Sequence, residues 1–353
     1  MANIRARSWL QVEAHNETFY QAGSARRPTF ELANAAHFPS LDGDRLMDDS
    51  RRLFDLSWVV ARSADHLVVN RFDRLSVTAA FGRSRVKLGR QVVTWGNGLL
   101  FNPFDLFSPY APTEIDRDYK RGEDGASWSV DAGEKLGDFE AVSLFKRDAT
   151  TGKAGTRQAS FGVKHHRLIG SGQWETTAIV GKHFGETIVG GGIVGRVGDV
   201  VGRSEWVHTK LADGAGSAWT GIANVDVAWV WKGMNSHAGA EYYFSSLGGS
   251  DATDLHSPRG RALRARLARG ELFVQGRHYL DGVFNVEPHP LVGVALNTIL
   301  NLSDKSGVVQ PSLTWDASSR IQGRVTATFM WGKRGSEFHQ MPNRIDVRVT
   351  TTF

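Results

Sequence analysis

The stretch that decides the fold is Asn343-Arg344-Ile345-Asp346-Val347-Arg348-Val349-Thr350-Thr351-Thr352-Phe353. Its odd-numbered residues suit an apolar environment, whereas its even-numbered residues are polar. Successive side chains of a β-strand point to opposite faces, so this pattern predicts one strand with an apolar face and a charged face. A transmembrane β-barrel needs such a strand, because its last strand has to pair with its first to close the wall.

The same alternation recurs along the chain. It is clearest at Ile4–Ala14, Ala223–Trp231 and Ile321–Trp331, and we expect Ile4–Ala14 to be the strand that pairs with the last one. Weaker segments bring the total to about eighteen strands, with sixteen as the alternative, at roughly twenty residues each. That spacing fits a membrane-spanning strand of about 9–11 residues plus a connection. The sequence therefore predicts an all-β fold, a transmembrane antiparallel barrel that forms a single domain over residues 1–353.

The amino-acid composition agrees with a membrane barrel and excludes transmembrane helices, disulfides and thiolate metal sites. The 353 residues are 41% hydrophobic but contain no run of eighteen apolar residues, so a transmembrane helix is excluded. The 11 Trp and 19 Phe residues suit the aromatic belts of a barrel, and five Trp are expected there, namely Trp219, Trp229, Trp231, Trp315 and Trp331. There is no Cys, which excludes disulfides and thiolate metal sites, and we expect no metal and no cofactor.

The chain start and the charge bear on export and partners. Residues 1–4 enter a strand pattern at once, so we expect a mature form from which an export signal has been removed. The net charge of +5 is not concentrated in a basic run with interleaved aromatics, so we expect no nucleic-acid partner.

One segment favours a helix over a strand. Ser257 suits an N-cap, Pro258 the first helical position and Gly270 the residue after the end, which predicts a short loop helix near 257–269. Its arginines form either a solvated face or a site for lipopolysaccharide phosphates or anionic solutes.

Counting back from the last strand, which descends to the periplasm, gives a topology. Short periplasmic turns are expected near 198–200, 233–236 and 317–319, and outer loops at 148–156, 211–218, 247–270 and 332–341. The stretch 35–51 is an exception, because this count places it on the periplasmic side, where it is too long.

The segment Gly96–Gly125 breaks the alternation. Pro103, Pro109 and Pro112 forbid a central strand, and about thirty irregular residues in a compact domain are usually functional. The segment is rich in Phe and Leu, so we expect it to fold into the lumen as a constriction or a plug. It also carries a set of carboxylates at Asp105, Glu114, Asp116, Asp118, Glu123 and Asp124.

Two interpretations of these carboxylates remain open. Arginines are expected on the inner face of the wall at Arg5, Arg7, Arg277, Arg324, Arg344 and Arg348. In the favoured interpretation, acidic loop and basic wall create a transverse field at a pore waist, with a weak preference for anions. In the other, the arginines only neutralise the loop acids and lock the loop in place.

A family resemblance supports the same architecture. The chain contains the runs Leu88-Gly89-Arg90-Gln91-Val92-Val93-Thr94-Trp95-Gly96-Asn97-Gly98, Asn102-Pro103-Phe104-Asp105-Leu106-Phe107 and Asn301-Leu302-Ser303-Asp304-Lys305-Ser306-Gly307. Together they resemble the signature of porin-like outer-membrane barrels of Gram-negative bacteria, loosely related to the alginate-export and phosphate-porin groups, and the resemblance covers most of the chain.

The resemblance implies a location in the outer membrane, in contact with lipid and lipopolysaccharide, and no catalytic residue. Phe353 resembles the terminal aromatic that barrel-insertion machinery uses as an assembly signal, and a homo-oligomer is an open possibility. We therefore expect a porin-like channel for passive diffusion of small solutes or ions and no enzyme. The alternative is the barrel component of a multi-protein export or electron-transfer complex.

Two further patterns bear on phosphate binding and on hydrolase activity. Gly190-Gly191-Gly192 lies within a strand pattern and lacks the Lys-Ser/Thr of a phosphate loop, so it predicts a close-packed strand. No spacing of Ser and His favours a hydrolase.

Overall fold

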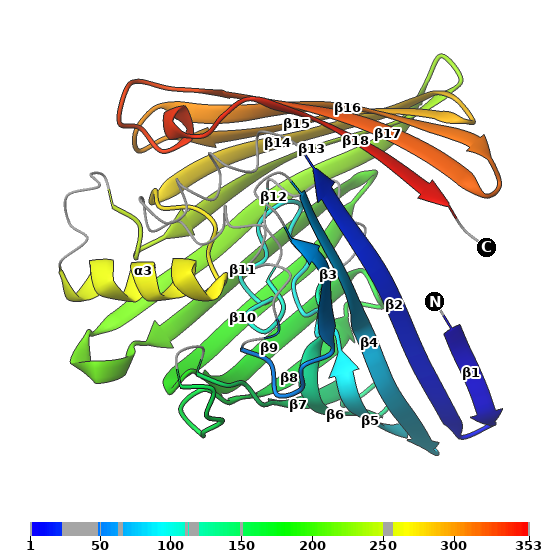
Figure 1. Cartoon of the computed structure of the whole chain (residues 1–353), viewed down its shortest axis with the longest axis vertical. Coiled ribbons are helices and arrows are strands. Elements are labelled where there is room, and N and C mark those ends of the chain that lie inside the picture. The colour runs from blue at the N-terminus through cyan, green and yellow to red at the C-terminus, as the bar shows by residue number, and fades with distance from the viewer. Residues whose placement is uncertain are drawn as a thin grey trace.

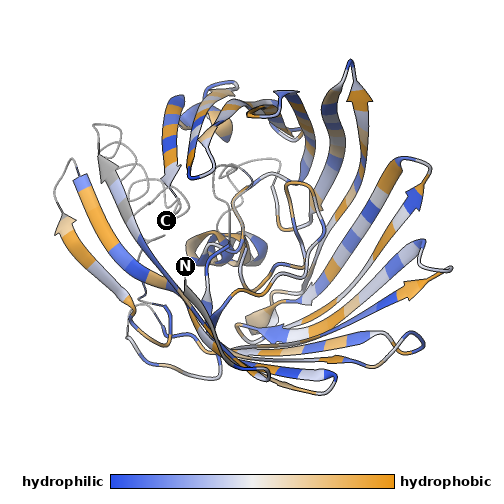
Figure 2. Cartoon of the chain, turned by 90° about the vertical axis from the view of Figure 1, so that its right-hand side faces the viewer, coloured by the Kyte–Doolittle hydropathy of each residue, from blue (hydrophilic) through white to orange (hydrophobic). Residues whose placement is uncertain are grey.

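The chain forms one antiparallel sheet of 18 strands that curls around a central space (Figure 1, Figure 2). The computed structural model describes residues 2–22, 49, 51–62, 66–109, 112, 120–148, 151–249 and 257–351. The strands are β1 Ala2–Arg7, β2 Leu10–Ala22, β3 Ser57–Arg62, β4 His66–Phe81, β5 Ser84–Gln91, β6 Glu123–Asp131, β7 Asp138–Leu144, β8 Ser160–Ile169, β9 Trp174–His183, β10 Glu186–Val197, β11 Val200–Lys210, β12 Ser217–Trp231, β13 Met234–Ser245, β14 His278–His289, β15 Val292–Asn301, β16 Ser306–Ser318, β17 Ile321–Trp331 and β18 Arg344–Thr351. The predicted all-β architecture and strand number are confirmed.

Within the described residues, three helical elements interrupt the strands: η2 Ala212–Gly214, α3 Pro258–Arg269 and η4 Phe338–Gln340. The sequence predicted α3 with its caps. The Ser257 hydroxyl accepts a hydrogen bond from the Gly260 N–H at 3.0 Å, and Gly270 ends the helix with φ of 70°. Within the described ranges, none of the helices has the length and apolar content to cross a membrane.

From β4 to β18, each strand pairs with the next along the chain. At the other end, β4 pairs with β2 along residues 66–79, with β3 along 67–71 and with β5 along 75–81. β3 and β5 therefore share one edge of β4. Among the described strands, the residue registers contain no ladder between β18 and β1, so the expected pairing of the first and last strands is not found there.

The predicted first strand, Ile4–Ala14, is wrong as a single strand. It is a hairpin of β1 and β2 that turns at Ser8 and Trp9, with Ala2 opposite Ala14 and Ile4 opposite Val12. From Ala2–Ala14 to Arg5–Gln11 the paired residue numbers differ by an even number, because a bulge between Arg5 and Arg7 offsets the odd difference of the Arg7–Leu10 pair. The alternation of β1 therefore continues in β2. The alternation of apolar and polar residues therefore does not reveal this turn.

The two faces of the wall differ as the sequence predicted. On β18, Ile345, Val347 and Val349 are 71%, 72% and 66% exposed. On β17, Phe329 is exposed while its neighbour Thr328 is fully buried. Figure 2 shows this alternation of apolar and polar residues along most strands. The wall therefore has an apolar outer face, while its inner face carries most of the buried polar side chains.

The connections at the two ends of the wall differ in length. At the turn end, residues 198–199, 232–233, 290–291 and 319–320 form tight turns. At the loop end lie the longer connections 92–122, 145–159, 246–277 and 332–343. This asymmetry agrees with the predicted topology. Most of the exceptional stretch 35–51 lies outside the described residues.

The two faces predict opposite responses to substitution. Val325→Arg or Val349→Arg places a charge on the apolar face and should block folding, or cost about 2–4 kcal/mol near a bilayer midplane. Arg348→Ala, on the inner face, should fold normally. Urea titration of the protein refolded into lipid vesicles measures both effects, and equal responses of the two faces would contradict the assignment.

Candidate functional site

Residues 92–122, here called the inserted segment, leave the wall after β5 and return to it at β6. Its described side chains pack against the inner side of the strands, and Figure 2 shows coil within the ring of strands. Its described parts are residues 92–109, 112 and 120–122. The predicted range, 96–125, is displaced at both ends, because β5 ends at Gln91 and β6 already begins at Glu123.

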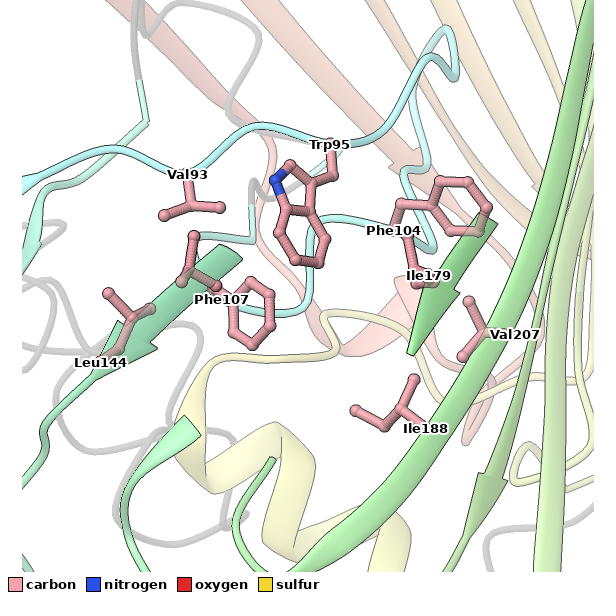
Figure 3. Packing of buried hydrophobic residues seen from close by; sticks show 9 residues of the cluster. Val93, Trp95, Phe104, Phe107, Leu144, Ile179, Ile188 and Val207 are labelled. Carbon is pink, nitrogen blue, oxygen red and sulfur yellow. The ribbon is translucent and has the colours of Figure 1, made fainter. Parts of the chain in front are cut away.

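Apolar side chains of the inserted segment pack against one side of the inner wall (Figure 3). Val93, Trp95, Phe104 and Phe107 are all buried, and Phe104 is fully so. Their partners on β7, β9, β10 and β11 are Val142, Leu144, Ile179, Ile188 and Val207. Burying each large apolar side chain contributes about 1.5–3 kcal/mol, so the hydrophobic effect holds the segment inside the barrel.

The triple glycine of β10 provides the seat of Phe104. A Cβ at Gly190 or Gly192 would come within 3.0 Å of the Phe104 ring. Only glycine lets the ring lie this close to the strand. The close contact agrees with the predicted close-packed strand and shows that the glycines make room for Phe104.

A second apolar cluster holds the tip of the inserted segment. The Phe101 ring stacks on Tyr243 of β13, with ring centres 4.2 Å apart, and lies 5.7 Å from Tyr279 of β14. Phe338 of η4 joins the same cluster. Segments from three distant parts of the sequence thus share one core inside the wall.

Two wall carboxylates hold the backbone of the tip. Glu241 of β13 accepts hydrogen bonds from the N–H groups of Leu99, Leu100 and Phe101, at 2.8, 3.1 and 2.7 Å. Glu205 of β11 accepts one from the Asn97 N–H at 2.5 Å. Here the wall supplies the acids and the loop supplies the donors, which is the reverse of the predicted arrangement.

The carboxylate of Asp105, the first predicted loop acid, has its bonding partners within the inserted segment itself. Its Oδ1 accepts hydrogen bonds from the N–H groups of Trp95 and Gly96, at 2.8 and 3.1 Å, and its Oδ2 pairs with Lys120. This geometry locks the fold of the segment. The predicted acids Glu114, Asp116 and Asp118 lie outside the described residues.

A buried ion cluster fixes the point where the segment rejoins the wall. Arg90 pairs with Asp49 and Asp124, both at 2.8 Å, and Arg52 pairs with Asp49 at 2.6 Å. Arg52 also donates to the Gly122 carbonyl at 2.9 Å. Burial alone would raise the pKa of Asp49, but the Arg52 and Arg90 guanidinium groups outweigh it and hold that pKa below its usual range. The predicted loop acid Asp124 thus serves as an anchor.

The predicted inner-face arginines are spread over the wall. Arg324 and Arg348 lie directly opposite each other on β17 and β18, and Arg324 donates to the Thr314 hydroxyl at 3.2 Å. Arg344 pairs with Asp346 at 2.9 Å. Asp105 contacts none of these three arginines.

The remaining predicted residues lie near the ends of the wall. Arg7 is exposed at the end of β1. Arg277 is exposed at the loop end and donates to the Gly248 carbonyl at 3.1 Å. Arg5 lies opposite Gln11 in the first hairpin, but its side chain, like Phe353, is outside the described part of the chain.

A cavity of about 500 Å³ with a mixed polar and apolar lining lies along β13 to β17, beside the tip of the inserted segment. Leu99 and Leu100 form its border with the segment. Its polar lining consists of His237, Asn285, Glu287, Asn297, Ser312, Thr314, Arg324 and Thr326. Of these residues, only Arg324 was predicted from the sequence to line the interior, although most of them occupy polar positions of alternating strands.

One side-chain arrangement invites comparison with a hydrolase. Ser160 Oγ lies 2.7 Å from His183 Nδ1, and His183 Nε2 lies 3.0 Å from Glu271. Ser160 and His183 are only 0% and 1% exposed, so no substrate carbonyl can reach the hydroxyl.

The arrangement anchors α3 to the wall instead. Glu271 also pairs with Arg269 of the helix, and Arg266 pairs with Glu186 at 2.5 Å. Burial would raise the pKa of Glu271, but Arg269 and His183 hold it well below its usual range. In the described part of the chain, no group of three or more His, Asp or Glu side chains could hold a metal ion.

Comparison with known proteins identifies the fold. No family model and no curated protein matches the chain. Wzi of Escherichia coli, an outer-membrane protein involved in group 1 capsule assembly and a carbohydrate-binding β-barrel, aligns over 98% of this chain and 75% of its own, with 9% identity and a TM-score of 0.57. A BenF-like porin of Pseudomonas fluorescens aligns over 98% and 88%, with 8% identity and a TM-score of 0.54. OccK10 of Pseudomonas aeruginosa aligns over 97% and 99%, with 9% identity and a TM-score of 0.53.

The fold is therefore that of Gram-negative outer-membrane β-barrels. At these identities the likeness concerns the fold alone. The resemblance to the alginate-export and phosphate-porin groups remains a prediction.

The three hydrogen bonds accepted by Glu241 predict that substitution of this residue loosens the inserted segment. Glu241→Ala removes the acceptor of three buried N–H groups, and each unsatisfied group costs about 1–3 kcal/mol. Limited proteolysis should then cleave within residues 97–122 while the wall stays intact. Glu287→Ala, an exposed acid on the neighbouring β14, is the matched control and should leave cleavage unchanged. Equal protection in the two variants would show that Glu241 does not hold the segment.

Proposed function

We propose that the chain is an outer-membrane, porin-like channel for passive diffusion of small polar solutes or ions. The observation that carries this proposal is the cavity of about 500 Å³ on the inner wall. Its lining includes hydroxyl and amide side chains together with His237, Glu287 and Arg324, inside a wall whose outer face is apolar. A polar interior within an apolar outer belt is the arrangement of water-filled barrels.

The outer face supports the membrane location. Exposed tryptophans lie near both ends of the wall, with Trp219 and Trp331 towards the loop end and Trp229, Trp231 and Trp315 towards the turn end. Tryptophan favours the two interfaces of a bilayer. We place the loop end outside the cell, in contact with lipopolysaccharide, and the turn end in the periplasm.

The inserted segment narrows the lumen in this proposal. Its apolar side chains occupy the space beside β7 to β11, and its tip lies against β12 to β14. Solutes would pass along the polar wall of β13 to β17, where Leu99 and Leu100 border the passage. The segment acts as a fixed constriction, because wall carboxylates and buried aromatic rings hold it.

A weak preference for anions follows from the charges that border the passage. Arg324 and Arg348 lie side by side on the inner face of β17 and β18. Glu241 and Glu205 are engaged with the backbone of the inserted segment and are buried. Glu287 remains as the carboxylate of the cavity lining, but the two guanidinium groups of the inner wall outnumber it, so their positive potential has the larger effect on passing ions.

Deletion of residues 99–120, replaced by a short Gly-Ser linker, tests the constriction. Single-channel conductance in planar bilayers should rise several-fold, because the tip that borders the cavity is removed. A deletion of residues 152–155 in the exposed loop-end connection serves as the control and should leave conductance unchanged. Unchanged conductance in a folded 99–120 deletion would place the constriction elsewhere.

The charge preference is tested by the reversal potential in a salt gradient. The wild-type protein should favour anions weakly, and the double variant Arg324→Gln, Arg348→Gln should lose that preference. Arg196→Gln, exposed at the turn-side end of β10, should behave like the wild type. A cation preference in the wild-type protein would overturn this part of the proposal.

A further inference from the structure

The connection between β17 and β18, residues 332–343, turns back into the mouth of the barrel and is here called the lid segment. Its η4 helix places Phe338 against the inner wall, where the side chain is 1% exposed. The Phe338 ring meets the Tyr279 ring edge-on, with ring centres 6.5 Å apart. The lid segment is therefore packed within the barrel mouth.

One buried carboxylate fastens the lid segment to three parts of the wall. Glu337 Oε2 accepts hydrogen bonds from the Tyr279 hydroxyl at 2.5 Å and from Asn301 Nδ2 at 2.7 Å. Glu337 Oε1 accepts a hydrogen bond from the Gln275 N–H at 2.7 Å. These partners lie on β14, on β15 and in the connection after α3, so a single side chain joins all three to the lid.

Among the residues that the structure describes, no Lys, Arg or His forms an ion pair with Glu337. Asp304, in the turn after β15, accepts a hydrogen bond from the Glu337 N–H at 2.7 Å. Other acidic groups on β13 and β14 of this wall are the phenol of Tyr243 and the buried carboxyls of Glu241 and Asp281. The basic residues of the lid segment itself, Lys333, Arg334 and His339, are exposed. In the described residues, Glu337 makes no ion pair with any of them.

Burial without a cation favours the protonated carboxyl. Burial raises the pKa of Glu337 to about 7, although the hydrogen bonds from Tyr279, Gln275 and Asn301 oppose the rise, and Asp304 adds to it. In the protonated state, the neutral carboxyl of Glu337 can still accept the hydrogen bond from the Tyr279 hydroxyl. The packed lid segment therefore accommodates a proton on Glu337.

We propose that the lid segment is a proton-controlled cover of the barrel mouth, with Glu337 as its fastening. Protonated Glu337 keeps the lid packed, and loss of the proton releases it. The sign follows from linkage: the packed state binds the proton more tightly than the released state, in which Glu337 is in water. Raising the pH from below 4.5 to above 7 therefore shifts the equilibrium towards release, by up to about 300-fold for the difference between these two values.

Release of the lid also affects the inserted segment. Tyr279 contacts Glu337 through its hydroxyl and the Phe101 ring through its own ring. Movement of the lid removes Phe338 from the cluster that holds the tip of the inserted segment. On the proposed function, the channel should then conduct better at high pH than at low pH.

Amide hydrogen exchange of residues 333–343 tests the lid independently of conduction. Wild-type protein, Glu337→Gln and Glu134→Gln are compared at pH 5.5 and at pH 8.5, so that the intrinsic effect of pH on exchange cancels between variants. Glu134, exposed in a turn at the other end of the wall, provides the matched control.

At pH 8.5, wild-type protein and Glu134→Gln should exchange these amides at least tenfold faster than Glu337→Gln, whose neutral side chain keeps the lid packed. At pH 5.5 this difference should be about thirtyfold smaller than at pH 8.5, because packed Glu337 is still protonated there. Glu337→Ala should exchange fast at both pH values, because it lacks the fastening. Equal exchange of wild-type protein and Glu337→Gln at pH 8.5, with Glu337→Ala equally slow, would overturn the proposal.

Single-channel recording separates this inference from the proposed function on which it rests. Conductance that rises with pH in the wild-type protein but not in Glu337→Gln supports both. If hydrogen exchange detects lid release in a protein that carries no current, the lid inference holds and the proposed channel function is wrong. If the current is independent of pH and exchange is uniform among the variants, the lid inference is wrong and the proposed channel function holds.

Discussion

The structure depends on one interaction inside the wall, the hydrogen bonding of three consecutive backbone N–H groups to the carboxylate of Glu241. The inserted segment has an irregular backbone, and a buried N–H group without an acceptor costs free energy comparable to a lost hydrogen bond. A neighbouring strand cannot supply these acceptors, because the segment crosses the lumen. Charged side chains of the wall supply them, and the aromatic rings on either side can then remain buried.

This interaction divides the interior into two regions. On one side, Phe104 and Phe107 form a dry core with the wall, closed off by the seat at Gly190 and Gly192. On the other side, hydroxyl, amide and guanidinium groups border a cavity. A barrel of this size needs the first region to keep its inserted segment fixed and the second to let polar solutes pass. The proposed constriction and the proposed lid meet at Tyr279, which contacts both.

Local patterns predicted the wall well and its interior poorly. The alternation of Ile345, Val347 and Val349 predicted the apolar face, and the caps at Ser257 and Gly270 predicted α3, because both signals lie within a few residues. The hairpin of β1 and β2 was missed because its register preserves the alternation.

The roles of the wall carboxylates could not be predicted in the same way. Glu241 lies about 140 positions from its partners in the sequence, and no local pattern assigns partners at that distance. The expected contact of acidic loop and basic wall is not found at Asp105 for a different reason, because its partners are local. Its partners are backbone N–H groups and a lysine of its own segment. Charge type alone does not reveal whether a carboxylate faces a pore or closes a turn.

The most direct test of the account asks whether the polar wall beside the inserted segment faces water. The chain contains no Cys, so single-cysteine variants report one position each. Thr314 lines the cavity on the inner face of β16, and its neighbour Leu313 points to the outer face. In lipid bilayers, a membrane-impermeant thiol reagent should modify Thr314→Cys and lower its current in steps, while Leu313→Cys should not react. Modification of Leu313→Cys, or an unreactive Thr314→Cys in a folded protein, would contradict a water-filled passage along this wall.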